Sequence, residues 1–409
     1  MGKVVQSSRD LTPADRKAFD RMIRCRPNLC RICNVGDLFD LQGLVVLHAG
    51  PAIEDSSNLS EPLANAVVVA ILFEGWASDQ STARRLLKDG RIILKAAQDF
   101  GAVTPLAAVF SPSMLVFVVE DLEKIGKPIV TPLNGGARNA LRFGIANRPT
   151  LENIRWLNSH LGPAMAAAID KPIDLLELAA RALDAGDDCH GLTTEGTKLL
   201  GRALSQERGW KILGGQVTRF MSVAESFFLN VWMAASRCIL SAAEDISGSS
   251  LVVGMGGNGH HFGIRLAHEP RKWTSTLSSP PLGPWQDSSD LSALGAIGDS
   301  AVIEGLGLGA MSWLQRERIP MEMKKFLPVN KLDIIRNLLV GRHEKLQSNI
   351  GLIARDIVKA GVSIPISLGV LDRKGEGGLA GRGIYFPPMT LFESAIDHQY
   401  DQNGGKTSI

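Results

Sequence analysis

The sequence predicts an α+β fold in which mixed-sheet α/β regions flank a mainly helical inserted domain. Short apolar runs bounded by Gly and Pro, typical of buried strands, occupy residues 41–144 and return after residue 251. Between them, residues 150–247 carry Leu and Ala at helical spacing and few strand signals. These patterns indicate an N-terminal α/β domain (1–149), a mainly helical domain (150–247), a C-terminal α/β domain (248–395) and a flexible tail (396–409).

The bulk composition is typical of a soluble globular protein with more than one core. The chain has 409 residues, of which 45% are hydrophobic and 21% are charged. Its net charge is +2 and its basic residues are scattered, so neither nucleic acid nor a membrane is expected as a partner. The polar N-terminus does not resemble a signal peptide, and no uncharged apolar run reaches the ~18 residues of a membrane span. We therefore expect a cytoplasmic protein.

The five cysteines are expected to be reduced thiols, because their number is odd and no secretion signal is present. Cys25, Cys30 and Cys33 lie close together, but neither a fourth Cys nor a nearby His completes a metal site. Their apolar neighbours favour a buried segment, so no metal is expected.

The N-terminal region is predicted to alternate helices and strands. Thr12 followed by Pro13 indicates the start of a helix. The run LVVL is strand-like and ends at His48 and Gly50, before a proline. His48 is either a ligand-binding residue at a strand end or a histidine satisfied by a backbone carbonyl. Residues 62–77 are apolar throughout and end near Glu74, which predicts an element buried on all sides.

A short polar helix (79–88) and two strands (RIILKA and MLVFVVE) are expected next. A third strand then leads into a turn at Asn134, Gly135 and Gly136 and into a helix start that contains Arg138 and Arg142. The turn amides and the two arginines could receive an anion. The alternative is a plain glycine turn beside surface arginines.

The segment GDDCHG (186–191) separates two predicted helices and contains two acids and His190. It is either part of a site or an inter-helix loop. Further on, residues 312–345 read as a solvated pair of charged helices, and residues 356–386 read as sheet with turns.

The run from Gly254 to Gly259 matches G-x-G-x-x-G, the spacing of a dinucleotide-binding turn. No amphipathic helix and no strand-terminal acid follow at the expected positions, so a nucleotide is disfavoured and no cofactor is expected. His260 and His261 are adjacent and would face opposite sides of a strand. The pair Asp299 and Ser300 lacks the G-x-S-x-G elbow of a hydrolase.

Several of these motifs, taken in order, resemble the large-subunit family of oxamate carbamoyltransferase. The resemblance is colinear from about residue 45 to residue 395. The matching segments are LHAGPAI (47–53), FEG around Glu74, AVTPLAAVFSPSMLVFVVE (102–120), LNGGARNALRFG (133–144), GDDCH (186–190), FFLNVWMAA (227–235), MGGNGHHFGIRLA (255–267), IGDSAVIEGLGLGA (297–310) and GRGIYFPPMTLFESA (381–395). The resemblance implies an α+β architecture with a helical insert and carbamoyl-transfer chemistry within a multi-subunit enzyme.

The sequence also departs from the family pattern. Members tend to carry histidines where this chain has residues 95–100, an Asn-Glu-Gly turn where it has Gly135, and Arg where it has Gly257. An Asn-Thr-Gly segment is replaced by Ser367-Leu368-Gly369. His, Glu and Arg are residue types that move protons and bind anions, so the resemblance implies an altered substrate or little activity of the chain alone.

Carbamoyl transfer needs oxyanion donors, cations for phosphate or carboxylate, and a proton carrier. His48 and His261 are the candidate proton carriers, and Asp299 or Glu304 would orient one of them. The candidate substrate-binding residues are Gly50, Glu74, Asn134, Gly135, Gly136, Arg138, Arg142, His190, Gly256, Asn258, Gly259, Arg265 and Ser300.

Three functions remain open at this stage. The first is a carbamoyltransferase-like enzyme acting on a small carboxylate, ureido or amide compound. The second is a hydrolase of a small amide or cyclic imide, and the third is a non-catalytic subunit of a multi-subunit transferase. The expected partners are a small-molecule substrate and either copies of this chain or other subunits. Convergence of His48, His261, Asp299 and Glu304 in one pocket would favour the first two functions.

Overall fold

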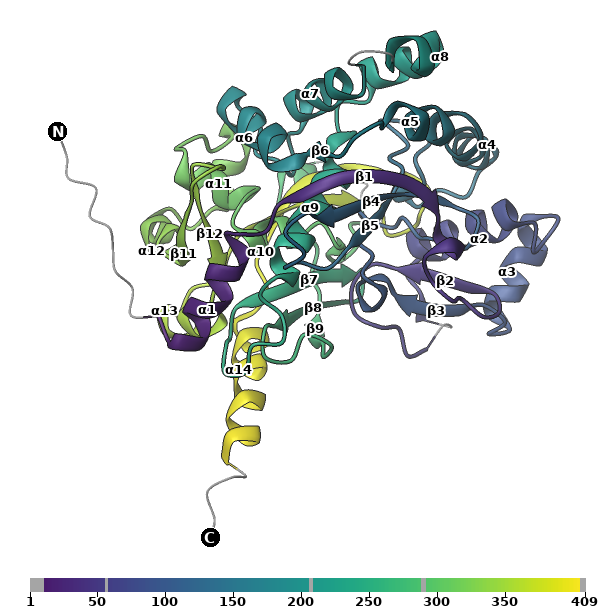
Figure 1. Cartoon of the computed structure of the whole chain (residues 1–409). Coiled ribbons are helices and arrows are strands. Elements are labelled where there is room, and N and C mark those ends of the chain that lie inside the picture. The colour runs from purple at the N-terminus through teal and green to yellow at the C-terminus, as the bar shows by residue number, and fades with distance from the viewer. Residues whose placement is uncertain (1–10, 56–57, 206–208, 288–291, 405–409) are drawn as a thin grey trace.

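The α+β fold class is confirmed by a computed structural model that describes residues 11–55, 58–205, 209–287 and 292–404 (Figure 1). The first part of the chain contains α1 (Pro13–Met22), β1 (Pro27–Asn34), β2 (Val45–His48), α2 (Glu61–Glu74), α3 (Gln80–Lys88), β3 (Ile93–Ala96), the 3-10 turn η3 (Ala97–Phe100), β4 (Leu115–Asp121), β5 (Ile129–Pro132) and the 3-10 turn η4 (Leu141–Phe143).

The middle of the chain is helical, as predicted. It contains α4 (Arg148–Trp156), α5 (Gly162–Ala168), the short strand β6 (Ile173–Asp174), α6 (Leu175–Ala185), α7 (Thr194–Ser205), α8 (Gly209–Val223) and α9 (Phe228–Ser241). A π-helical turn (Leu157–Leu161) joins α4 to α5, and Gly214 interrupts α8 with non-helical backbone angles.

The last part returns to strands and short helices. It contains β7 (Val252–Asn258), β8 (His261–Leu266), β9 (Thr274–Leu277), β10 (Ile297–Gly298), α10 (Val302–Leu306), α11 (Ala310–Gln315), the 3-10 turn η7 (Met321–Phe326), α12 (Leu332–Arg336), β11 (Leu339–His343), β12 (Ser348–Leu352), α13 (Ala354–Ala360), β13 (Ile366–Leu371), β14 (Leu379–Tyr385) and α14 (Met389–Gly404).

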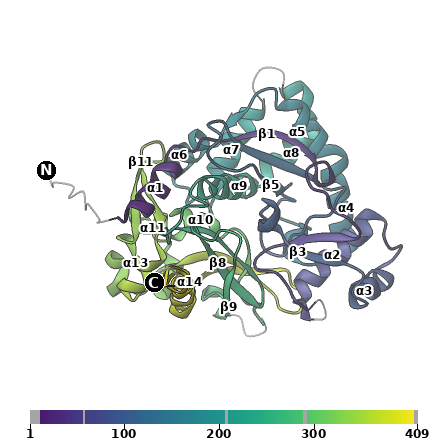
Figure 2. The ribbon, with the colours of Figure 1, turned by 60° about the horizontal axis from the view of Figure 1, so that its bottom comes forward.

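Two four-stranded sheets form the framework of the molecule. One has the order β5-β4-β1-β6, and the other has the order β10-β7-β8-β9; neighbouring strands in both are antiparallel. Three two-stranded pairs accompany them: β11 with β12, β13 with β14, and the parallel pair β2 with β3. Figure 2 shows α9 at the centre of the molecule, among these sheets.

Strand β4 separates two hydrophobic cores, because side chains alternate between the faces of a strand. Phe117 and Val119 face the core around α9, whereas Val116 and Val118 face the core built by β2, α2 and the segment 102–114. Strand β7 divides its neighbours in the same way. Val253 belongs to the α9 core, and Val252 packs with β8, β13, β14 and α14. The two sheets therefore connect all three cores.

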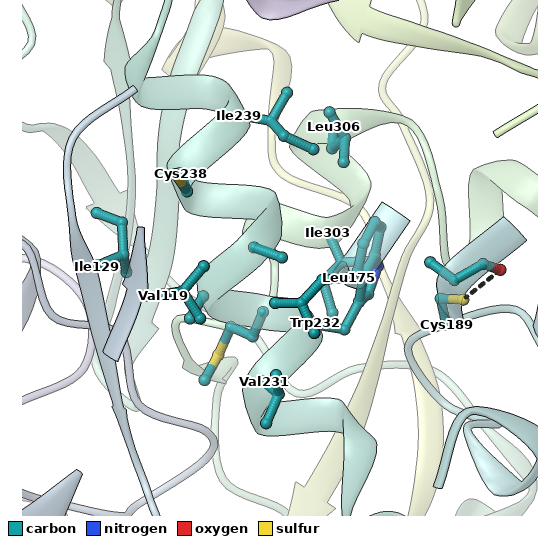
Figure 3. Packing of buried hydrophobic residues seen from close by; sticks show 14 of the residues in the cluster. Val119, Ile129, Leu175, Cys189, Val231, Trp232, Cys238, Ile239, Ile303 and Leu306 are labelled. Carbon is teal, nitrogen blue, oxygen red and sulfur yellow. Dashed lines mark hydrogen bonds between the residues drawn. The ribbon is translucent and has the colours of Figure 1, made fainter. Parts of the chain in front are cut away.

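Helix α9 is buried on nearly every side, which explains its apolar sequence. Residues 230–241 are all buried, so this helix has no solvent-facing stripe. Figure 3 shows its residues Val231, Trp232, Cys238 and Ile239 packed between strand residues Val119 and Ile129 on one side and Leu175, Ile303 and Leu306 on the other.

Several local predictions are confirmed by the backbone. Thr12 caps α1 with its side chain, which accepts a hydrogen bond from the amide of Asp15. Helix α2 is buried on all sides from Pro62 to Ile71, and Gly75 ends it in a left-handed conformation. Strand β2 ends at His48, as the LVVL run predicts.

Other segments differ from the expectation. No α-helix starts at Arg138 or Arg142: a loop leads into η4, and α4 begins only at Arg148. The expected second charged helix is short, and its C-terminal part is strand β11, which pairs with β12. Residues 354–360 form a helix, α13, within the expected sheet region. Helix α14 continues through Gly404, so the chain is still helical beyond residue 396.

Within the described residues, no single helix is both long and apolar enough to cross a membrane. The segments Gly214–Val223 and Phe228–Ser241 together have the length and apolar composition of a span, but they meet at an angle of 76°.

Candidate functional site

Asp299 is the centre of a fully buried polar group that joins the N-terminal part of the chain to β7 and β10. It follows β10, and its carboxylate accepts three hydrogen bonds: from the amide of Gly50 at 3.0 Å, from Nε2 of Gln98 at 2.6 Å and from the amide of Thr104 at 3.0 Å. Gly256 of β7 lies against the same carboxylate, since an added Cβ would be 2.6 Å from Oδ1. Asp299 therefore holds β2, η3 and β7 together.

Burial raises the pKa of Asp299 to about 7, although the hydrogen bonds from Gly50, Gln98 and Thr104 oppose this shift. A carboxyl with this pKa could exchange a proton near neutral pH. Its hydrogen-bond partners are all protein groups, however, and it lines none of five well-formed cavities in the described part of the chain. The contacts of Asp299 are those of a residue that organises the backbone.

Arg265 lies beside this group but is already engaged. It forms an ion pair with Asp99, donates from Nη1 to the carbonyl of Pro270 at 3.3 Å, and stacks over the ring of Trp273 with 4.2 Å between Cζ and the ring centroid. Its Nε is buried without a partner among the described residues, and the role of Arg265 in substrate binding stays a prediction.

His48 is buried at the end of β2 with one ring nitrogen unused. Its Nδ1–H donates to the carbonyl of Ala49 at 2.8 Å, and Nε2 has no partner among the described residues. Burial lowers its pKa to about 4, so the imidazole is neutral at physiological pH. The structure therefore agrees in part with both alternatives raised for His48. A backbone carbonyl accepts a hydrogen bond from Nδ1, and Nε2 has no protein partner among the described residues.

His48 is expected to make the protein less stable in acid. The unfolded chain binds a proton at this imidazole below pH 6.5, whereas the folded protein resists protonation down to about pH 4. Stability should thus fall as the pH drops through this window, by up to ~3 kcal/mol, since one pKa unit corresponds to ~1.4 kcal/mol. The variant His48→Leu should lack this component in urea unfolding measured from pH 8 to pH 4. At pH 8 both states hold a neutral ring, so any difference there reports packing and the lost hydrogen bond to the carbonyl of Ala49. An identical pH slope in both proteins would contradict the burial of a neutral His48.

Glu304 and His190 form a second buried pair. Nδ1–H of His190 donates to both carboxylate oxygens of Glu304, at 2.9 and 2.8 Å. The amides of Ala310 and Ser367 donate to the same carboxylate at 3.0 Å each. Burial raises the pKa of Glu304, and His190 together with the two amides opposes the shift. The GDDCHG segment is therefore tied to α10 and β13 through these two side chains.

Asn258 shapes the turn between β7 and β8. Its Oδ1 accepts the amides of His260 and His261, at 3.0 and 2.8 Å, and its Nδ2 donates to the carbonyl of Pro51 at 3.1 Å. His261 is exposed and lines a cavity of about 280 Å³ together with Asn258, His260 and residues 51–55. Gly256 lies within β7 and pairs with Gly263 of β8, so this glycine belongs to a strand. The amides proposed as donors at Gly256–Gly259 are therefore not those of an open turn: Gly256 and Gly257 are strand residues, and the amide of Gly259 donates to the carbonyl of Ala296 at 3.1 Å.

Arg142 is buried without a carboxylate partner. Its Nη2 donates to the carbonyl of Gly136 at 3.0 Å and to Oγ of Ser226 at 2.7 Å, while Nε is buried and has no partner among the described residues. Burial alone lowers its pKa to about 10, which leaves it charged at neutral pH. Its guanidinium also lies over the ring of Phe143, with 4.9 Å between Cζ and the ring centroid, so a ring and two hydrogen bonds stabilise the charge in place of a carboxylate.

A cavity of about 30 Å³ adjoins Arg142 and is lined by further polar groups. Asn134 donates from Nδ2 to the carbonyl of Ser226 and accepts the amide of Gly136. Asn230 of α9 also lines the cavity, and its Oδ1 has no partner among the described residues. Gly135 completes the turn at this wall. The anion-receiving turn predicted from Asn134, Gly135, Gly136 and Arg142 is thus brought together in space.

The remaining candidate residues lie outside these groups. Arg138 is exposed. Glu74 accepts the amide of Ser113 at 2.8 Å, and the carbonyl of Ser300 accepts the amide of Ile303 in the turn that enters α10. Of the four predicted catalytic residues, only His48 and Asp299 are linked, through Gly50. Glu304 pairs with His190, and His261 lines a separate cavity. The four side chains do not converge in one pocket.

Sequence reasoning missed the partners that complete each group. Gln98 and Thr104 bind Asp299, Ser226 and Asn230 surround Arg142, and Asp188 anchors the loop before His190. Each of these residues is far from its partner in sequence, except for Asp188, so local pattern gave no signal for them. Gln98 lay within a segment noted only as a departure from the family pattern.

The geometry defines an α+β protein with a cavity beside a buried arginine. Comparisons with known proteins identify its family. A family model described as oxamate carbamoyltransferase subunit AllG matches residues 92–300, slightly more than half of the chain. The chain belongs to this family.

Two proteins of Escherichia coli K12 resemble the chain over most of its length. Oxamate carbamoyltransferase subunit AllG is 28% identical, over 94% of this chain and 96% of that protein. The uncharacterized protein YahG is 27% identical, over 94% of this chain and 85% of that protein. A crystal structure of a conserved protein of unknown function from Enterococcus faecalis V583 superposes with a TM-score of 0.85, at 25% identity, and the match covers 95% of this chain and 97% of that one. Family membership and fold therefore agree.

Proposed function

We propose that this chain is a subunit of a carbamoyltransferase-type enzyme and that it holds the anionic head group of a small substrate beside Arg142. The observation that carries the proposal is the buried Arg142 guanidinium, which has no carboxylate partner among the described residues. Carbamoyl phosphate and oxamate both carry an anionic group that such a guanidinium would bind.

The geometry around Arg142 supports a ligand with both acceptors and donors. The guanidinium has an unused donor at Nε, and Asn230 has an unused acceptor at Oδ1. A carboxylate adjacent to an amide, as in oxamate, offers oxygen atoms to the first and an N–H group to the second. The cavity of about 30 Å³ has room for about two water-sized groups. It therefore admits about two atoms of a head group, such as the oxygens of a carboxylate, and the rest of a ligand would extend toward the loop of Gly135.

The dispersion of the other polar residues supports a subunit that works with a partner chain. Glu304 and His261 lie apart from the group that contains His48 and Asp299, and Asp299 already accepts three hydrogen bonds from protein donors. A proton carrier close to Arg142 is not supplied by these four residues. The related E. coli protein is itself described as a subunit. We therefore propose that another chain completes the reacting centre, in a hetero-oligomer.

The test is anion binding by the variant Arg142→Met. The wild-type protein should bind oxamate and carbamoyl phosphate, and each ligand should raise the melting temperature, because it binds only the folded state. Arg142→Met should weaken binding at least ~10-fold, since it removes a charge-assisted contact. In the absence of ligand its stability should change by no more than ~2 kcal/mol, because the lost hydrogen bonds are offset by removal of a buried charge.

The matched control is Arg138→Met, which removes an exposed arginine four residues earlier. It should leave both melting-temperature shifts intact. Equal loss of binding in the two variants would indicate a general charge effect and would sink the proposal. A hydrolase of a small amide, the alternative function, would turn over its substrate with no phosphate present, and steady-state assays with and without phosphate separate the two.

A further inference from the structure

A second cavity lies beside the GDDCHG segment and is not part of the Arg142 site. Its volume is about 300 Å³. Its walls come from the loop between α6 and α7, from α11 with the segment after it, and from Arg382 of β14. No residue lines both this cavity and the one beside Arg142. The volume is in the range of pockets that take small metabolites.

Three arginines line the cavity and retain unused donors. Nε of Arg382 and Nε of Arg316 are both buried without a partner among the described residues. Arg318 is exposed, and the hydrogen bond found for it runs from Nη1 to the carbonyl of Leu183 at 3.1 Å. Gly191 makes room for the Arg382 guanidinium, because an added Cβ would lie 1.8 Å from Nη2. The wall thus contains guanidinium groups with N–H donors that no protein acceptor among the described residues occupies.

The acids in the same wall are turned to internal donors. Asp188 accepts the amides of His190 and Leu192 at 2.8 Å each, the indole N–H of Trp313 at 2.8 Å, and Nη2 of Arg382 at 3.4 Å. Asp187 accepts two amides at the start of α7, from Glu195 and Gly196. Glu322, the third acid of the lining, is exposed. Two of the three acids therefore have their acceptors occupied and the third is exposed to solvent, while arginine donors remain unused, so the cavity favours an anion.

We infer that this cavity is a second anion site, which binds a small compound bearing a carboxylate or a phosphate through Arg382 and Arg318. Planar guanidinium groups match the geometry of both anions. Asp188 fixes Arg382 at the wall and joins it to the loop of His190, so the site is held by the same segment that carries the buried His190–Glu304 pair. Each chain would accordingly carry two anion sites.

The experiment is calorimetric titration of the full chain with inorganic phosphate and, separately, with oxamate. The variant Arg142→Met serves as the background, so that the first site does not contribute. In this background at least one of the two anions should still bind with one site per chain. Adding Arg382→Met or Arg318→Gln should weaken that binding at least ~10-fold. The anion that binds identifies which of the two head groups the cavity takes.

Control variants separate loss of the cavity's arginines from a general effect of removing a positive charge. Arg342→Gln removes an exposed arginine on β11, outside the cavity, and should leave binding unchanged. Arg382→Met also removes a contact to Asp188 and could disturb the fold. If circular dichroism shows that it does, the anion binding of Arg318→Gln is the test of the site. The inference is overturned if the Arg142→Met protein binds neither anion, or if Arg318→Gln and Arg342→Gln behave alike. Binding that survives Arg142→Met unchanged, and is lost with Arg382→Met, would support this site and count against the proposed function.

Discussion

Replacing Asp299 by alanine is expected to lower the free energy of unfolding by about 3–6 kcal/mol. The change leaves three buried donors without an acceptor: the amides of Gly50 and Thr104, and Nε2 of Gln98. Each unsatisfied buried donor costs about 1–3 kcal/mol. The loss should be partial in Asp299→Asn, because the amide keeps one acceptor oxygen but turns an N–H group toward a donor.

Urea unfolding at pH 8, followed by far-ultraviolet circular dichroism, measures this effect. The control is Asp79→Ala. Asp79 also accepts an amide and side-chain hydroxyls at the start of α3, but it is exposed, so water replaces it there. Its loss should shift the midpoint much less. Similar shifts in the two variants would show that Asp299 is not an essential acceptor in the interior.

Gly50→Ala is expected to be at least as damaging, at about 4 kcal/mol or more. Gly50 has a φ of +76°, and a Cβ there would lie 2.4 Å from the carbonyl carbon of Gly257 and 2.7 Å from the amide nitrogen of Asn258. Both contacts are with backbone, which cannot rotate away as a side chain can. The substitution would separate β2 from β7 and break the hydrogen bond to Asp299.

Gly75→Ala isolates the steric part of this prediction. Gly75 has a φ of +73°, and an added Cβ would meet nothing within 4 Å. Its replacement should cost only the conformational strain, about 1–2 kcal/mol. The comparison is made by thermal and urea unfolding of both variants. If the two cost the same, the close approach of Gly50 to β7 would be refuted.

Local pattern was enough to predict much of the fold. The continuous apolar run MLVFVVE predicts β4, and Thr12 with Pro13 predicts the start of α1. These features depend on neighbours a few residues apart. The Asn134–Arg142 group was also predictable, because its turn and one of its arginines lie within ten residues.

Features set by distant partners could not be predicted. Arg138 and Arg142 look equivalent in sequence, and only the contact with Ser226, 84 residues away, shows that Arg142 is the buried one. The glycines of β7 resemble a nucleotide turn because their close approach to Gly50 and Ala296 is invisible in a linear pattern. Likewise, β11 requires its partner β12 to be recognised as a strand.

Departures from the family pattern at Gln98, Gly257 and Ser367 lie around the buried carboxylates, whereas the one at Gly135 lines the cavity beside Arg142. Gln98 binds Asp299, and the amide of Ser367 binds Glu304. At Gly257 an added Cβ would lie 2.2 Å from the carbonyl oxygen of Ala296, so this backbone leaves no room there for the Arg that relatives tend to carry. Such close packing agrees with a stabilising role for the interior around Asp299, apart from the anion site that we propose at Arg142.

The order of the first sheet has a consequence for how this protein can be divided. Strand β1, from residues 27–34, lies between β4 and β6, so the first strand of the described residues sits inside the sheet and not at its edge. The matched family segment, 92–300, lacks that strand and also β2, the parallel neighbour of β3. That segment is therefore the part of the sequence that the family model matches, but it is not an independently folding domain. A truncation at its N-terminal boundary would remove β1 from the middle of a four-stranded sheet and β2 from its pair with β3, so the segment is not expected to fold as the full chain does.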